Sequence, residues 1–281
     1  MKVGIVGLGL IGGSLGLDLR SHSWEVIGVS RSKHTCEVAV ERGAVDRASV
    51  SLQDLGTANL DVIFLCTPIP AIAPTLATLK NYLTPETTVT DVGSVKGTVT
   101  QTCTSLWQNF VGGHPMAGTA AQGIEAAQKN LFVNAPYVIT PTASTAVTAI
   151  KKIEEIALAL GCNVYFCTPE AHDRAVSWIS HLPVMVSAAL IAASLGESDP
   201  TVLELAKNLA SSGFRDTSRV GGGNPELGLM MAKYNREEVL RSLQHYHKNL
   251  AEIIQLIEQE NWAKLAQILE STQQARPDFL S

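Results

Sequence analysis

The sequence of 281 residues predicts an α/β protein in two parts, a doubly wound and mostly parallel sheet over residues 1–166 and an all-α domain over residues 167–281. Three observations lead to this prediction. Short β-branched runs alternate with helix-like segments in the first part, which is typical of a parallel sheet with helices on both faces. A glycine-rich turn follows the first of these runs. After Thr168 the pattern changes to long helices, and no further strand is expected.

The expected strands are short apolar runs separated by helix-like stretches. They are KVGIVG (2–7), EVIGVS (25–30), DVIFLCT (61–67), TTVTDVG (87–93), FVGG (110–113), YVIT (137–140) and NVYFC (163–167). The apolar start superficially resembles a secretion signal. Its glycine spacing and the absence of a small-residue cleavage site favour a first strand and turn instead.

The second part is expected to begin with a capped helix, because Thr168 stands at an N-cap position and Pro169 at the first helical position. The longest apolar run, 182–196, has about 15 residues. Roughly 20 are needed to span a bilayer, so we expect a buried helix and no membrane. Its apolar surface extends around much of the helix, which indicates a dimer interface. Further helices are expected at about 200–212, 225–233, 236–260 and 262–275, with GGGNP (221–225) as a break that could line a site.

Composition describes a packed globular protein, with 46% hydrophobic and 17% charged residues. The formal net charge of −5 argues against nucleic acid or an anionic membrane as a general partner. The five cysteines are odd in number and form no C-x-x-C pair, so reduced thiols in a cytoplasmic protein are expected. No residue spacing typical of a metal site is present, and we expect no metal.

The first turn carries a dinucleotide-binding pattern. Gly7, Gly9 and Gly12 form G-x-G-x-x-G between the first strand and a helix that begins near Ile11. Such glycines permit a tight turn, close approach of a pyrophosphate and close packing of helix on strand. The alternative is an ordinary glycine-rich turn. The residues Gly7, Gly9, Leu10, Ile11 and Gly12 are therefore candidate cofactor contacts.

The residues about 20 positions further on bear on the type of nicotinamide cofactor. An enzyme that uses NAD carries an acidic residue there. This chain has Ser30, Arg31 and Ser32. Arg31 can bind a 2′-phosphate through charge-assisted hydrogen bonds. The sequence therefore predicts NADP, with a solvated loop cation as the alternative for Arg31.

Two further segments, 66–71 (CTPIPA) and 90–97 (TDVGSVKG), follow the third and fourth expected strands. They lie at carboxyl ends of strands, where doubly wound sheets bind ligands. Ser94 and Lys96 are then expected near the nicotinamide or the substrate, although Ser94 can also cap a helix that begins near Val95. The cofactor candidates in these segments are Cys66, Thr67, Pro68 and Ser94.

The segment FVGGHPMAG (110–118) contains His114, preceded by two glycines and followed by a proline. It follows the fifth expected strand, and we expect a tight loop there. No charged residue lies within five positions of His114 on either side. A histidine without an adjacent carboxylate has less reason to be protonated, so it can serve as a neutral base.

Several segments together resemble the prephenate/arogenate (cyclohexadienyl) dehydrogenases of tyrosine biosynthesis, and most of all an NADP-dependent arogenate dehydrogenase. They are GLGLIGGSLG, CTPIPA, TDVGSVKG, GGHPMAGT, HDRAVSWISHLP and SSGFRDTSRVGGGNPEL. The resemblance implies a Rossmann domain followed by a helical dimerisation domain. It also implies an oxidative decarboxylation in which hydride passes to the nicotinamide and the ring carboxylate leaves as CO2.

The resemblance assigns roles to individual residues. His114 matches the histidine that takes the proton from the ring 4-hydroxyl, and Ser94 a serine that hydrogen-bonds this hydroxyl and the histidine. Arg219 matches an arginine that holds a substrate carboxylate, and Asp216 is expected to orient Arg219 or a neighbour. Thr119 matches a position lining the substrate pocket.

Three residues of the first helix of the second part belong to the same comparison. His181 and Ser180 match substrate-pocket positions, while His172 is either functional or structural. His172 and His181 are nine residues apart, which places them on roughly opposite faces of an ideal helix. Pro183 can bend that helix.

Two departures from the family pattern favour arogenate over prephenate. Val184 stands where some prephenate-using relatives have histidine, and Ala120 where some have an acidic residue. The alternatives are a prephenate dehydrogenase, a β-hydroxyacid dehydrogenase or imine reductase, and a non-catalytic NADP-sensing module. The helix after Thr168 has no lysine, which argues against the second of these, and His114 argues against the third.

Overall fold

A computed structural model describes residues 1–119 and 121–280, so Ala120 lies outside the described residues. The chain forms two compact units, Met1–Asn235 and Arg236–Ser281.

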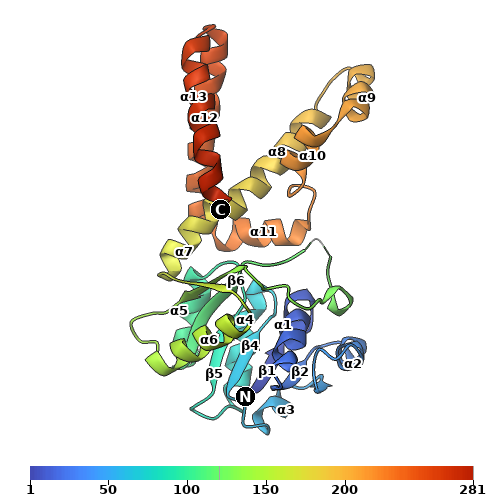
Figure 1. Cartoon of the computed structure of the whole chain (residues 1–281), viewed down its shortest axis with the longest axis vertical. Helices are drawn as coiled ribbons and strands as arrows, with labels where there is room; N and C mark the ends of the chain where they lie inside the picture. The colour runs from blue at the N-terminus through green and yellow to red at the C-terminus, as the bar shows by residue number, and fades with distance from the viewer. Residues whose placement is uncertain (120, 281) are drawn as a thin grey trace. The chain divides into compact units, whose positions relative to one another are not determined.

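The first unit contains an eight-stranded sheet in the order β3-β2-β1-β4-β5-β6-β7-β8 (Figure 1). All neighbouring strands pair in parallel except β6 and β7, which are antiparallel. The predicted doubly wound, mostly parallel sheet is therefore confirmed. The strands are β1 (Lys2–Val6), β2 (Glu25–Val29), β3 (Arg47–Ser49), β4 (Val62–Leu65), β5 (Thr88–Asp91), β6 (Phe110–Pro115), β7 (Pro136–Thr140) and β8 (Asn163–Phe166).

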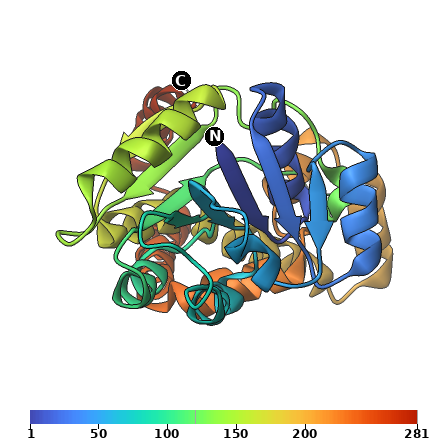
Figure 2. The ribbon, with the colours of Figure 1, turned by 90° about the horizontal axis from the view of Figure 1, so that it is seen from below.

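Helices cover both faces of this sheet and create two apolar cores (Figure 2). One core joins the sheet to α1 (Leu10–Ser21), α2 (Lys33–Glu41) and α6 (Val147–Ala159), and includes the short 3-10 helix η1 (Ile124–Ala126). The other joins it to α3 (Gln53–Gly56), α4 (Ile69–Leu79) and α5 (Gly97–Leu106). Each fully buried Leu or Ile side chain contributes roughly 1.5–3 kcal/mol relative to exposure. The strands β1 and β4 carry buried apolar residues on both faces of the sheet, which is why they have no polar alternation.

The sequence did not predict β3 or α3. The three residues of β3 are Arg-Ala-Ser, so they carry no β-branched apolar signal. The strand exists because its backbone pairs with β2, where Arg47 lies opposite Ile27. Tertiary hydrogen bonding thus overrides local propensity at this edge of the sheet.

The helical part of the first unit begins with α7 (Pro169–Val176), continues through a π-helical segment (Ser177–His181) and ends with α8 (Leu182–Leu195). The Thr168 hydroxyl accepts a hydrogen bond from the Ala171 N–H, which confirms the predicted N-cap. The π-helical segment lies just before Pro183, which has no N–H and whose ring displaces the carbonyl four residues earlier. The helices α9 (Pro200–Leu209), α10 (Ser212–Ser218) and α11 (Pro225–Tyr234) follow, and α10 was not predicted.

The prediction that 182–196 forms a buried helix is wrong for the isolated chain, because only Leu182 and Ser187 of α8 are buried. The reason is that α8 is apolar around its circumference while the chain covers only part of it. The continuous helical stretch Pro169–Leu195 has 27 residues and contains an 18-residue window with a mean hydropathy of 1.7. It therefore passes the length and composition test for a membrane span, which the shorter run in the sequence did not. One such helix is weak evidence, because apolar helices of soluble proteins pass the same test.

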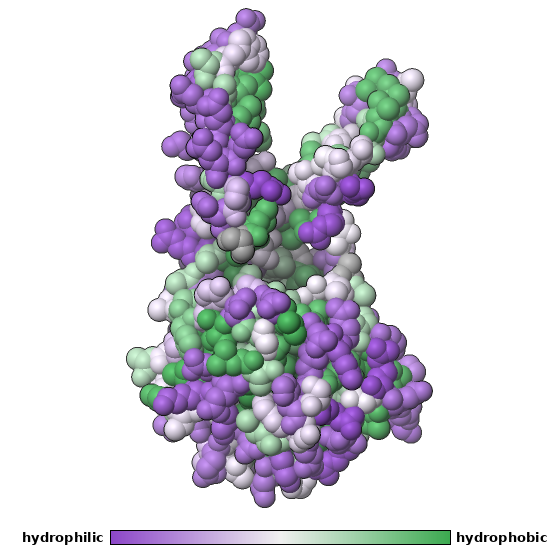
Figure 3. All heavy atoms as spheres, viewed as in Figure 1, coloured by the Kyte–Doolittle hydropathy of each residue, from purple (hydrophilic) through white to green (hydrophobic). Residues whose placement is uncertain are grey.

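Further apolar side chains are exposed on α9. Val202, Leu205 and Leu209 are 47%, 55% and 70% exposed. Their spacing of three and four residues places them on one face of the helix. Figure 3 shows apolar atoms gathered over α9.

The second unit is an α-hairpin of α12 (Arg236–Glu258) and α13 (Trp262–Ala275), followed by the 3-10 helix η3 (Arg276–Phe279). The Lys264 ammonium donates to the Glu252 carboxylate across the hairpin. Several large apolar side chains of this unit are exposed, namely Leu240, Tyr246, Leu250, Ile254, Ile257, Trp262 and Leu269. Like α8 and α9, the hairpin has more apolar surface than its own chain covers.

Candidate active site

The glycine-rich turn between β1 and α1 has a backbone that side chains would obstruct. Gly7 has a φ of +100°, and a Cβ there would lie 2.5 Å from the Cys66 carbonyl oxygen. A Cβ on Gly12 would lie 2.0 Å from the Gly7 carbonyl oxygen. A Cβ on Gly9 would meet nothing within 4 Å, so this position faces open space at the start of α1. The turn thus leaves room for a phosphate beside the unpaired N–H groups at a helix N-terminus.

The end of β4 lies directly against this turn. The Cys66 N–H donates to the Val6 carbonyl oxygen over 2.7 Å. The hydroxyl of Thr67 is buried without a hydrogen-bond partner, which is costly unless a ligand supplies one. Burial raises the pKa of the Cys66 thiol, so this group stays protonated. β1 and β4 are neighbours where the strand order reverses, and such switch points bind nucleotides in doubly wound sheets.

The residues after β2 are placed at the same edge. The Ser32 hydroxyl accepts from the Thr35 N–H and caps α2, and the Ser32 N–H lies 3.4 Å from the Ser30 hydroxyl. Arg31 is exposed and forms no ion pair with the part of the chain that the structure describes. Its guanidinium is therefore available to a ligand.

His114 lies on a strand and not on a tight loop, which corrects the prediction. It is the fifth residue of β6, and it pairs with Val138 of the antiparallel strand β7. The sequence did not reveal this pairing because the flanking glycines and proline are residues that usually end strands. His114 is only 9% exposed, so its ring is fixed by the surrounding structure.

His114 belongs to a chain of side chains that ends on a carboxylate. Its Nδ1 lies 2.8 Å from Nε2 of His172, and Nδ1 of His172 lies 2.8 Å from Oδ1 of Asp173. The Asp173 carboxylate also accepts from the backbone N–H groups of Lys96 and Gly97, over 2.7 and 2.8 Å. Asp173 therefore caps α5 from another helix. Ser94 does not cap it, because α5 begins at Gly97.

Lys96 supports the backbone beneath His114. Its ammonium is fully buried, donates to the Asp91 carboxylate and donates to the Gly113 carbonyl oxygen over 2.7 Å. Asp91 in turn accepts from the N–H groups of Gly93 and Gly113. The charge of Lys96 thus holds β5 and β6 together beside His114, and its expected place near the nicotinamide or the substrate stays a prediction.

His181 is fully buried and reaches the same region from the π-helical segment. The amide nitrogen of Asn235 donates to the Asp173 carbonyl oxygen over 2.8 Å and lies 3.1 Å from His181 Nδ1. The Asp173 carbonyl oxygen can only accept, so the Asn235 atom that faces it must be the amide nitrogen. The second hydrogen of that nitrogen is donated to Nδ1 of His181. The proton of neutral His181 is then on Nε2, which is buried without a hydrogen-bond partner.

The predicted opposition of His172 and His181 is absent, since both side chains are buried and linked through Asp173 and Asn235. A π turn holds more residues than an α turn and rotates the following side chains. Asn235 was missed by the sequence analysis. It sits at the C-cap of α11, where asparagine is common for conformational reasons alone.

Both proposed functional imidazoles are held neutral. Burial lowers the pKa of His114 well below its ordinary value, and His172, Lys96 and His181 act in the same direction. Burial lowers the pKa of His181 to about 4, His172 adds to the effect and Asp173 opposes it. His114 is therefore able to accept a proton, and His181 to donate a hydrogen bond through Nε2.

The lowered pKa of His181 predicts a loss of stability in acid. The unfolded state binds this proton near pH 6.5 and the folded state only near pH 4. The contribution is complete above pH 6.5 and is lost as the pH falls through that window, by roughly 3 kcal/mol. Between pH 7 and pH 4, the free energy of unfolding measured in urea should fall by roughly 3 kcal/mol less in His181→Gln than in the wild type. The control is His34→Gln, because His34 is exposed. An equal pH dependence of stability in the wild type, His181→Gln and His34→Gln would contradict the assignment.

Five other predicted site residues make no hydrogen bond to this network. Ser180 is half-buried and Thr119 is exposed, with its hydroxyl accepting from the Ala121 N–H. Arg219 is exposed at the C-cap of α10 and forms no ion pair with any described residue. Asp216 pairs with Arg215 over 3.3 Å, so it orients a neighbour and not Arg219. Ser94 is also partly exposed and makes no hydrogen bond to His114.

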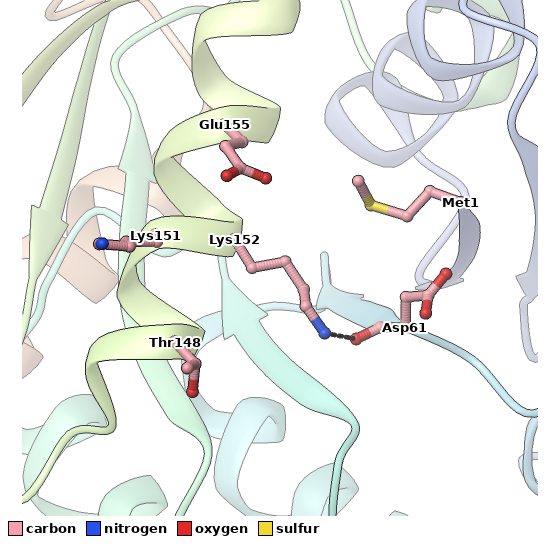
Figure 4. A pocket seen from close by; sticks show the side chains of 6 residues that line it. All are labelled: Met1, Asp61, Thr148, Lys151, Lys152 and Glu155. Carbon is pink, nitrogen blue, oxygen red and sulfur yellow. Dashed lines mark hydrogen bonds between the residues drawn. The ribbon is translucent and has the colours of Figure 1, made fainter.

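An open depression of about 360 Å³ lies elsewhere on the sheet, against α6 (Figure 4). It is lined by Met1, Asp61, Thr148, Lys151, Lys152 and Glu155. Met1 and Asp61 precede β1 and β4, so the depression lies at the amino ends of the strands. Ligands of doubly wound sheets bind at the opposite, carboxyl ends. Among residues 1–119 and 121–280 there is no cluster of three or more His, Cys, Asp or Glu that could hold a metal ion.

The chain is similar to known proteins over nearly its whole length. A crystal structure of arogenate dehydrogenase from Synechocystis is 55% identical, with a TM-score of 0.90, covering 99% of this chain and 100% of that one. A crystal structure of prephenate dehydrogenase from Aquifex aeolicus, in complex with hydroxyphenyl propionate and NAD+, is 28% identical, with a TM-score of 0.94 and coverage of 99% and 98%. Prephenate dehydrogenase of Bacillus subtilis is 31% identical over 97% of this chain and 74% of its own length.

Two family descriptions match the sequence. Residues 15–166 match the nucleotide-binding domain of prephenate dehydrogenase, and residues 168–271 match its dimerization domain. Together they account for most of the chain, in the order in which the sheet and the helices occur. The chain therefore belongs to the prephenate dehydrogenase family.

Proposed function

We propose that this protein catalyses the NADP-dependent oxidative decarboxylation of arogenate to tyrosine. The observation that carries this proposal is His114, a buried neutral imidazole at the ligand-binding end of the sheet, with no described partner at Nε2. The 55% identity to an arogenate dehydrogenase over the whole chain supports arogenate as the substrate. The alternative within the same family is a prephenate dehydrogenase, which converts prephenate to 4-hydroxyphenylpyruvate.

The residues at the switch point fit a nicotinamide dinucleotide. The turn at Gly7, Gly9 and Gly12 would hold the pyrophosphate, with N–H groups of Leu10 and Ile11 at the helix start, and the segment Cys66–Pro68 would lie beside the nicotinamide. The buried Thr67 hydroxyl would gain a hydrogen-bond partner from this group. When bound, the cofactor supplies the hydride acceptor for the reaction.

In this proposal His114 is the general base. Its Nε2 takes the proton of the ring 4-hydroxyl while that carbon is oxidised. Loss of the ring carboxylate as CO2 then leaves a phenolate, which takes a proton back to give the aromatic phenol. A positioned base is typically worth about 10²–10⁴ in rate. Ser94 would hydrogen-bond the same hydroxyl, from the segment between β5 and α5.

The anionic groups of the substrate need partners in a protein of net charge −5. We assign one carboxylate to Arg219, whose guanidinium is exposed and unpaired among the described residues. His181 would donate its Nε2–H to a substrate oxygen, with Ser180 and Thr119 lining the pocket. Val184 gives the pocket an apolar wall where some prephenate-using relatives have histidine, which favours arogenate.

NADP specificity is proposed from Arg31. A 2′-phosphate would gain charge-assisted hydrogen bonds from its exposed guanidinium, while Ser30 and Ser32 offer hydroxyls and no repelling carboxylate. We expect Arg31→Ala to raise the KM for NADP by about 10-fold or more, the loss of one or two charge-assisted hydrogen bonds. The KM for NAD should change little. The neighbouring Lys33→Ala, whose ammonium faces Glu37, is the control, and equal effects of Arg31→Ala on both cofactors would contradict the assignment.

One assay tests the reaction as a whole. The protein is incubated with arogenate or prephenate, each with NADP or NAD, and the reduced nicotinamide is followed by absorbance. We expect the highest kcat/KM with arogenate and NADP. A higher kcat/KM with prephenate would make prephenate the assigned substrate. A higher kcat/KM with NAD would make NAD the assigned cofactor. Binding of NADP without turnover of either substrate would favour a sensor.

The domain functions follow the two family matches. We propose residues 1–166 as the NADP-binding domain and residues 167–281 as the substrate and dimerisation domain of a cytoplasmic homodimer. Exposed apolar faces on α8, α9 and the α12–α13 hairpin support a dimer, because each has more apolar surface than one chain covers. No nucleic acid or membrane partner is proposed.

A further inference from the structure

The carboxylate of Asp173 fixes the protonation of His172. An ionised carboxylate only accepts hydrogen bonds, and Asp173 already accepts from the N–H groups of Lys96 and Gly97. The 2.8 Å contact from Asp173 Oδ1 to His172 Nδ1 therefore requires a proton on that nitrogen.

The protonation of His172 then fixes that of His114. With its proton on Nδ1, neutral His172 has a lone pair on Nε2. The 2.8 Å contact between this atom and His114 Nδ1 is a hydrogen bond only if His114 donates it. The two rings stand at 71° to each other, which directs one ring edge at the other. His114 consequently carries its proton on Nδ1, and its Nε2 retains a lone pair.

If His172 donated the hydrogen bond to His114 instead of accepting it, His114 would have no free lone pair on Nε2. If His172 carried two protons, its Nε2 would donate to His114, and neutral His114 would then be protonated on Nε2. Which ring nitrogen of a histidine is protonated depends on the hydrogen bond that the other nitrogen makes. Nothing else among the described side chains contacts Nδ1 of His114 by a hydrogen bond, so this choice depends on His172.

We infer that Asp173 and His172 are positioning residues that select the Nδ1–H tautomer of His114 and thereby present its Nε2 lone pair to the substrate. The role of that lone pair in the reaction rests on the function proposed above, whereas the tautomer itself does not. The same carboxylate caps α5, so the base and the helix that follows Ser94 are held by one side chain.

The tautomer can be measured without turnover. Protein containing 15N-labelled histidine is studied by two-bond 1H–15N correlation at a pH above the titration of free histidine, and His114 is assigned by its loss in His114→Asn. We expect a protonated Nδ1 and an unprotonated Nε2. In His172→Phe, which keeps the ring but has no acceptor, the His114 proton should move at least partly to Nε2. His172→Gln offers an amide oxygen near the position of Nε2 and should restore the wild-type pattern. A wild-type His114 protonated on Nε2, or a pattern unaffected by His172→Phe, would overturn the inference.

Kinetics test the functional part. His172→Phe should lower kcat by about 10²–10⁴-fold, which is the contribution of a positioned base, and loss of the correct tautomer in a catalytic triad costs about 10⁴. His172→Gln should recover most of it. His22→Phe, an exposed histidine that packs beside Trp24, should leave kcat unchanged. An altered tautomer with unaltered kcat would refute the positioning role. If the wild type turns over neither substrate, the proposed function fails and the tautomer measurement still decides the inference.

Discussion

Replacing His114 by asparagine is expected to lower kcat by about 10²–10⁴-fold while the affinity for NADP changes little. Asparagine keeps a polar group near Nδ1 of the imidazole, so it can still donate to Nε2 of His172. It has no basic nitrogen at the position of Nε2, so no residue takes the proton of the ring hydroxyl. The loss should therefore be in the chemical step and not in cofactor binding.

The measurement is steady-state kinetics across pH, combined with titration of NADP by fluorescence or calorimetry. The matched control is His34→Asn, since His34 is an exposed histidine at the start of α2. Near-full kcat of His114→Asn across pH would refute the base assignment. A large loss of NADP affinity would instead indicate that the substitution disturbs β6 and the switch point.

Replacing Lys96 by methionine is expected to lower the free energy of unfolding by about 3–5 kcal/mol. The side chains of Lys96 and Asp91 are both fully buried, so the variant leaves an uncompensated carboxylate in the interior. It also removes the hydrogen bond to the Gly113 carbonyl oxygen, next to His114. Most proteins have a total stability of only 5–15 kcal/mol, so this is a large share.

Urea unfolding followed by circular dichroism measures this loss. The double variant Lys96→Met with Asp91→Asn removes both charges and should recover much of the stability, because it is the unpaired charge that is costly. Lys151→Met, on the exposed surface of α6, should change it by less than about 0.5 kcal/mol. A loss for Lys96→Met as small as that of Lys151→Met would mean that the buried pair contributes little to stability.

The elements that the sequence predicted well are those with a strong local pattern. The strands β1 and β4 are apolar runs between turn residues, β5 is rich in β-branched residues, and α12 and α13 have clear helical periodicity. The elements that it missed have weak local patterns. β3 exists because of its hydrogen bonds to β2, and the glycine at position 213 weakens the helical signal over α10.

The candidate site divides in the same way. The glycine motif, Arg31 and His114 could be identified from residue type and spacing, because their chemistry is distinctive and they follow expected strands. The sequence could not predict the partners of the Lys96 side chain, for a physical reason. Whether a lysine near a strand end faces a ligand or a buried carboxylate depends on the side chains that pack around it, and Asp91 alone in the sequence does not decide this.

By itself, the sequence determined the doubly wound sheet, the glycine-rich turn, the helical second part and the histidine at the end of the fifth expected strand. These features follow from periodicity, turn chemistry and the side-chain types of neighbouring residues. Only the tertiary structure decided that His172 and Asp173 form a hydrogen-bonded chain with His114, that Asn235 links Asp173 to His181, and that α8 remains uncovered within one chain. His114 and His172 are 58 positions apart, and Lys96 and Asp173 are 77 apart. Contacts at such separations depend on how a helix docks on a sheet edge, which no local pattern specifies.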